Sequence, residues 1–247
     1  MKKIISAFLI LALAPALSLA AGPSVPLDKA DIDLHDKDSL RNGARLFVNY
    51  CLSCHSAAYM RYNRMGQDLG LTDAQVKENL MFAAEKVGET MTIAMPANDA
   101  KAWFGTKVPD LTVVARARGA DWLYSYLRGF YLDDSRPWGV NNTVFKDVGM
   151  PHVLWELEGL RKPIYETRKD HEGNDVKHIV GFEEVVPGKL SRAEYDQAVR
   201  DLVNFMVYMG EPAKLKRYTI GVWVLLYLAL LFVVAYALKR EYWKDIH

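Results

Sequence analysis

Two cysteines and a histidine at positions 51, 54 and 55 have the types and spacing best suited to chemistry. They form the run Cys51-Leu52-Ser53-Cys54-His55, and these two are the only cysteines among the 247 residues. Two thiols one helical turn apart can each add to a vinyl group of the same porphyrin, and the next residue can then point its imidazole at the iron. The motif predicts one c-type haem, attached covalently through Cys51 and Cys54 and ligated by His55.

Two other kinds of site use closely spaced cysteines. A thiol-disulfide oxidoreductase places its Cys-x-x-Cys pair at a helix N-terminus after a strand, whereas this pair follows a helical pattern. A zinc site needs further ligands in a second cluster. The other histidines form no such cluster along the chain: His35, His152, His171, His178 and His247. The haem interpretation is therefore preferred.

The sixth iron ligand of an electron-transfer haem is usually Met or a second His. Some of the nine methionines follow His55 too closely or fit a helical core stripe: Met60, Met65, Met206 and Met209. Other candidates remain: Met81, Met91, Met95 and Met150. Met95 and Met150 each precede a proline in sequence without helical character, which can aim a thioether rigidly. Spacing alone does not choose between them.

Apolar segments at both ends of the chain indicate export and a membrane anchor. Residues 1–20 combine two lysines, an apolar run and a small-residue ending, which predicts a signal peptide cleaved after Ala20. Residues 219–238 are uncharged and long enough to cross a bilayer as a helix. Basic and aromatic residues follow, as expected on the cytoplasmic side. We therefore expect a single-pass protein of the bacterial inner membrane, with a periplasmic haem domain over 21–213 and a cytoplasmic tail over 239–247.

Charge and composition limit the functions that the chain can have. The 31 basic and 30 acidic residues give a formal net charge of +1, so the composition offers no electrostatic footprint for nucleic acid. Half of the residues are hydrophobic (51%), which is ample for a packed core. With both cysteines in one motif, a disulfide framework is not expected.

Local patterns predict a mainly α, cytochrome c-like haem domain with long loops, a small β-hairpin excursion and one C-terminal transmembrane helix. A helix capped by Asp38 or Ser39 delivers Cys51 to the core. Capping boxes at Thr72 and Ser191 open two more helices, which end at Gly88 and Gly210.

The middle of the chain is predicted to be less regular. Prolines bound an expected loop over 96–109. A short helix is expected over 111–118, and Asp121 is expected to cap another that runs to about 130. Residues 131–160 are rich in Pro, Gly and Asn and predict a long ordered loop. Two strand-like stretches around a turn predict the β-hairpin between about 163 and 187.

Several ordered segments make the chain resemble the cytochrome c1 family, the haem subunits of cytochrome bc1 complexes (ubiquinol:cytochrome c oxidoreductases). The resemblance covers most of the mature sequence, although residues 163–187 are not one of its marks. Its marks are the segment 51–56, Tyr59-Met60-Arg61-Tyr62, Pro109-Asp110-Leu111, Arg116-Ala117-Arg118, Gly149-Met150-Pro151 and a C-terminal anchor after Glu211-Pro212. It implies Met150 as the sixth iron ligand, with Met95 as second choice. It also implies that Arg118 lies near a haem propionate and that Pro109 lines the haem pocket.

The resemblance further implies a role in electron transfer. Single electrons pass from the Rieske iron-sulfur protein to a soluble or tethered cytochrome c, with cytochrome b and membrane lipid as neighbours. The chain is then the electron-transfer subunit of a quinol-cytochrome c reductase and has no substrate chemistry at its own site. The alternative is a free-standing, membrane-tethered cytochrome c that donates to a terminal oxidase. Its haem domain is usually smaller and its tether often N-terminal, so the large exported domain and the C-terminal anchor disfavour it.

Overall fold

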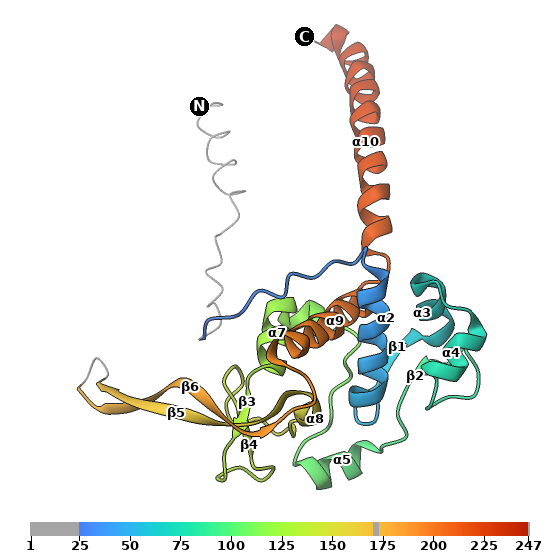
Figure 1. The fold of residues 1–247 in the computed structure, drawn as a ribbon. Helices are drawn as coiled ribbons and strands as arrows, with labels where there is room; N and C mark the ends of the chain where they lie inside the picture. Colours follow the sequence, from blue (N-terminus) through green and yellow to red (C-terminus); the bar gives the residue numbers. More distant parts are fainter. Residues whose placement is uncertain (1–24, 170–172, 247) are drawn as a thin grey trace.

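The computed structural model describes residues 25–169 and 173–246 (Figure 1). The predicted signal peptide, residues 1–20, lies outside the described residues. Figure 1 shows a helical body from which two elements project: the long helix α10 (Lys214–Tyr242) and a hairpin of β5 (Gly159–Lys169) and β6 (Asp175–Pro187). The body holds the haem motif, so its packing decides the geometry of the site.

Helix α2 (Lys37–Leu46) delivers the motif to the core, as predicted. It continues as one π-helical turn, η1 (Phe47–Cys51), which ends on the first cysteine of the motif. The predicted cap at Asp38 or Ser39 is wrong. The Asp36 carboxylate accepts hydrogen bonds from the two backbone amides at 38 and 39, so this earlier residue already satisfies the free N–H groups of the first turn.

Helix α9 (Arg192–Gly210) packs against α2 and begins with the predicted Ser191 capping box. Gly43 of α2 allows this close approach, since a Cβ there would lie 2.0 Å from the carbonyl oxygen of Asp201. The Asp201 side chain accepts hydrogen bonds from Ser39 Oγ (2.7 Å) and Asn42 Nδ2 (2.6 Å). This helix pair holds the turn that carries the cysteines.

Downstream of the motif lie β1 (Ala57–Arg61), α3 (Tyr62–Leu69), α4 (Asp73–Asn79) and β2 (Thr90–Met91), with β1 and β2 paired antiparallel. The Thr72 capping box is confirmed, but the predicted extension of its helix to Gly88 is wrong. The chain leaves the helix at Leu80 because its following residues bond to α3 instead: Asn63 N–H donates to Val87 O at 2.7 Å. A tertiary contact outweighed helical periodicity here.

The segment before Pro109 is more helical than predicted, whereas the segment after it has its helices where they were expected. Helix α5 (Ala97–Phe104) occupies most of the expected 96–109 loop. Helices α6 (Val114–Arg118) and α7 (Ala120–Leu127) are present where helices were expected. Asp121 does not cap α7, because its carboxylate accepts the backbone N–H of Ala30 (2.9 Å). The N-cap residue of α7 is instead Gly119, whose φ of 89° favours glycine.

Residues 131–160 are only partly loop. β3 (Phe130–Leu132) pairs with β4 (Val140–Asn142), and α8 (Trp155–Glu158) leads into β5. The predicted hairpin exists as the antiparallel pair β5–β6, but it is longer than a small excursion. The mainly α class is thus partly confirmed: about half of the described residues are helical, and they also form three two-stranded sheets.

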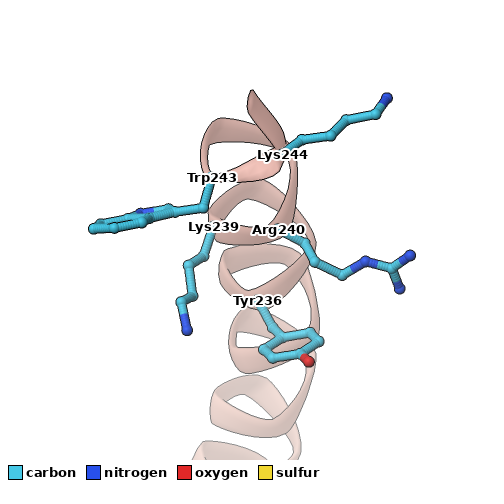
Figure 2. Close-up of a pocket in the computed structure, with 5 residues that line it drawn as sticks. All are labelled: Tyr236, Lys239, Arg240, Trp243 and Lys244. Atoms are coloured by element: carbon cyan, nitrogen blue, oxygen red, sulfur yellow. The ribbon is translucent and has the colours of Figure 1, made fainter. Parts of the chain in front are cut away.

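Helix α10 contains the predicted membrane span, residues 219–238, and within the described residues it is the one helix long and apolar enough to cross a bilayer. A short 3₁₀ turn, η2 (Lys244–Ile246), follows it. Figure 2 shows basic and aromatic side chains around this end of the helix: Tyr236, Lys239, Arg240, Trp243 and Lys244. Such residues anchor a helix end at a membrane interface, so α10 fits a single-pass anchor.

Candidate haem-binding site

The two cysteines share a tight turn at the end of η1. Backbone N–H groups of Cys54 and His55 both donate to the carbonyl of Cys51, at 3.0 and 2.8 Å. The Cys51 side chain is buried and that of Cys54 is half-buried. Burial, with a smaller contribution from neighbouring Cys54, raises the pKa of Cys51 to about 12. A disulfide oxidoreductase needs a low thiol pKa for its nucleophile, so this environment disfavours that activity.

The His55 ring is oriented by a backbone carbonyl. His55 Nδ1 lies 2.7 Å from the carbonyl oxygen of Pro109, and because a carbonyl only accepts, Nδ1 carries the proton and donates. The lone pair of the neutral ring is then on Nε2, the nitrogen available to a metal. Burial lowers the pKa of His55, which favours this neutral form. The prediction that Pro109 belongs to the site thus has a physical basis in its carbonyl.

Asp110 holds the Pro109 segment against the haem motif. One carboxylate oxygen accepts the backbone N–H of Ala58 (2.8 Å), and the other accepts Thr112 N–H (2.8 Å) and Oγ–H (2.6 Å). Leu111 N–H also donates to Ser56 O at 2.9 Å. Asp110 is one of the marks of the family resemblance, but its type and spacing did not predict a role at the site. Its signal is the Asp-Leu-Thr order, which is typical of an Asx turn.

We expect Asp110→Ala to destabilise the haem-loaded protein by about 1–2 kcal/mol, because the substitution removes a cap-like set of hydrogen bonds. Guanidinium denaturation followed by the Soret band measures this loss. Asp134→Ala serves as the control, because Asp134 is an exposed carboxylate in the loop between β3 and β4. This variant should unfold at the same guanidinium concentration as the wild type. Equal midpoints for the two variants would contradict a role for Asp110 at the site.

A row of side chains leads from the end of α6 to Met150. The Arg118 guanidinium lies 5.0 Å from the ring centre of Trp122, and the rings of Trp122 and Tyr126 stack at 4.9 Å with 9° between their planes. The Tyr126 hydroxyl then donates to Met150 Sδ at 3.4 Å. Sequence analysis missed Tyr126, since nothing along the chain connects α7 with the Gly-Met-Pro segment.

Met150 and Met95 differ in their surroundings. Met150 packs against a small hydrophobic cluster of Phe130 on β3, Val140 on β4 and Val148 from the segment that follows β4. Met95 is half-buried just before Pro96, the N-cap residue of α5. The rigid support behind Met150 favours it as a ligand, because the sulfur of a ligand must be held in place.

The described contacts form two groups. In one, His55 contacts Pro109. In the other, the rings of Trp122 and Tyr126 connect Arg118 with Met150. A neutral imidazole with a free Nε2 and a thioether are the donors that hold haem iron in Met/His cytochromes. Two thiols on the turn before the imidazole match the attachment pattern of c-type haem. The residues present therefore fit a haem of this type.

Comparison with known proteins identifies the family of this chain. The model of the "Cytochrome C1 family" matches residues 29–158 and 185–246, leaving out most of the β5–β6 hairpin. The chain is 50% identical to cytochrome c1 of Allochromatium vinosum over the full length of both proteins. It is 46% identical to the ammonia monooxygenase gamma subunit of Nitrosomonas europaea, covering 97% of this chain and 98% of that one. It is 23% identical to cytochrome b/c1 of Bradyrhizobium diazoefficiens, covering 86% of this chain and 34% of that one.

The family match spans well over half of the chain, and the full-length similarity to a cytochrome c1 includes the haem motif and the anchor helix. The chain therefore belongs to the cytochrome c1 family, whose members carry haem and transport electrons in bc1 complexes.

Proposed function

We propose that this chain receives single electrons from a Rieske iron-sulfur protein and passes them to a soluble or tethered cytochrome c within a bc1 complex. The observation that carries the proposal is the His55 ring: it follows Cys54 directly, and its Nδ1 proton is bound to the Pro109 carbonyl, which leaves Nε2 free. In a member of the cytochrome c1 family, this is the geometry of a proximal haem ligand.

Each site residue has a separate part in holding the cofactor. The thiols of Cys51 and Cys54 would attach a haem through thioether bonds, each adding S and H across one vinyl group, and His55 and Met150 would be its iron ligands. Arg118 is exposed, and its guanidinium would pair with a haem propionate, because a guanidinium binds a carboxylate through two parallel hydrogen bonds. When bound, such a haem would supply one-electron chemistry at its iron, and the residues of this chain would hold it without changing any substrate bond.

The protein environment favours the reduced state of such a centre. A Met ligand would raise the reduction potential, and the buried side chains around Cys51 would keep water away from a haem attached there. Both effects suit an acceptor downstream of a high-potential iron-sulfur centre. Residues 21–213 are proposed to face the periplasm, and α10 to cross the inner membrane in contact with lipid and cytochrome b.

One relative carries a name that points to a different parent enzyme, ammonia monooxygenase. Our proposal rests on features of a haem site that passes electrons. Another relative is named cytochrome b/c1, and this name supports cytochrome b as the membrane partner. A free-standing cytochrome remains the alternative that an experiment must separate from a bc1 subunit.

Purification of the complex separates these functions. An affinity tag after residue 247 is used to isolate the chain from detergent-solubilised membranes of its native host. We expect b-type haem and a Rieske centre, detected by its paramagnetic signal, to co-purify with the chain. We also expect a quinol to reduce the c-type haem of the preparation. Isolation of the c-type haem alone would support the free-standing cytochrome, and isolation with ammonia-oxidising activity would contradict the bc1 assignment.

A further inference from the structure

The hydroxyl of Tyr126 makes a contact that the proposed function does not yet use. We propose that Tyr126 is a positioning residue, whose hydroxyl hydrogen bond to Met150 Sδ holds the thioether and raises the reduction potential of the haem. This inference rests on the proposed function, because it requires Met150 to be the sixth ligand of the iron.

The contact is compatible with iron ligation. Tyr126 Oη lies 3.4 Å from Met150 Sδ, and the thioether has no hydrogen, so the hydroxyl is the donor. A thioether sulfur has two lone pairs. One can bind iron while the other accepts the hydroxyl proton, so ligation does not require this hydrogen bond to break.

Other aromatic rings contact the Tyr126 ring on two sides. Trp122 stacks on it at 4.9 Å, and Phe130 meets it edge-on at 5.4 Å with 69° between the planes. The Tyr126 ring and Met150 both pack against the cluster that contains Phe130. The rings on both sides therefore hold the donor in position.

The hydrogen bond acts on the iron through the sulfur. A donor at the second lone pair draws electron density from the thioether, which then donates less to ferric iron than it would alone. The ferrous state is favoured, and the reduction potential rises. Loss of one hydrogen bond of ordinary strength changes the ferrous-to-ferric equilibrium by about twofold to tenfold. A tenfold change corresponds to about 59 mV for a one-electron couple.

Tyr126→Phe tests this inference in the purified, haem-loaded complex, because it removes the hydroxyl and keeps the ring. We expect its midpoint potential to fall, by an amount equivalent to about a twofold to tenfold change in the redox equilibrium. We also expect the far-red sulfur-to-iron charge-transfer band of the ferric protein to shift. Tyr124→Phe is the matched control: Tyr124 is a buried tyrosine on the same helix, and its ring lies 4.4 Å from the Arg128 guanidinium. This control should leave both readings unchanged.

Each outcome decides the inference. An unchanged potential and band in Tyr126→Phe, or an equal shift in Tyr124→Phe, overturns it while the haem assignment stands. Complete loss of the band in Tyr126→Phe alone, with covalent haem retained, supports it, because the sulfur then needs the hydroxyl to remain on the iron. Loss of the band in Met95→Leu instead of Met150→Leu overturns the ligand assignment, and this inference falls with it.

Discussion

The Met150→Leu variant is expected to keep its covalent haem and to have a much lower reduction potential than the wild type. Leucine has nearly the volume of methionine, so the cluster of Phe130, Val140 and Val148 stays filled, but it offers no lone pair to the iron. The expected fall is on the order of 0.1–0.3 V, within the roughly 0.8 V range that axial ligands span. Redox titration of the α-band in the purified complex measures it, and the far-red charge-transfer band should vanish.

Met95→Leu is the control for this experiment. Met95 is the other methionine that precedes a proline, and the same substitution there should leave potential and spectrum unchanged. The reverse pattern is a lowered potential in Met95→Leu and an unchanged potential in Met150→Leu. This result would show that the loop before α5 provides the ligand. Unchanged spectra in both variants would point to a ligand of another type.

Replacing both cysteines by alanine is expected to remove the haem from the denatured chain completely. Thioether bonds survive denaturation, whereas haem that is held by ligands alone is extracted. A haem stain on a denaturing gel should follow the wild-type chain and be absent from the Cys51→Ala/Cys54→Ala double variant. Each single variant should retain one thioether and show a shifted α-band, because one vinyl group stays unreacted.

Ser53→Ala provides the matched control, since Ser53 lies exposed between the two cysteines on the same turn. Its stain should equal that of the wild type. Maleimide labelling of the denatured wild-type chain gives an independent reading: no thiol should react when both sulfurs are bound in thioethers. Two reactive thiols without any stain would instead identify a thiol-disulfide protein, and a stain that persists in the double variant would place the attachment elsewhere.

Patterns within a few residues predicted the local structure well. The capping boxes at Thr72 and Ser191 both open helices, because each depends only on a hydroxyl and a carboxamide or carboxylate three residues apart. The helix before Cys51 follows from its periodic apolar residues. The apolar run in α10 is visible from composition alone.

Prediction failed where distant residues competed for the same backbone groups. The helix after Thr72 was expected to reach Gly88, yet it ends at Asn79, and the residues beyond it bond to α3. Asp121 was expected to cap α7, but its carboxylate binds the amide of Ala30, far away in the chain. Local propensity is a weak determinant once a tertiary partner is available.

By itself, the sequence determined the chemistry of the site: the thiol pair, the adjacent imidazole and a short set of candidate methionines. These follow from residue types within one turn of chain, where covalent geometry sets the distances. Only the tertiary structure decided that the Pro109 carbonyl orients His55 and that Tyr126 reaches Met150. Such contacts join residues many positions apart. Their partners are decided by how α2, α7 and α9 pack, and a short stretch of sequence does not contain this information.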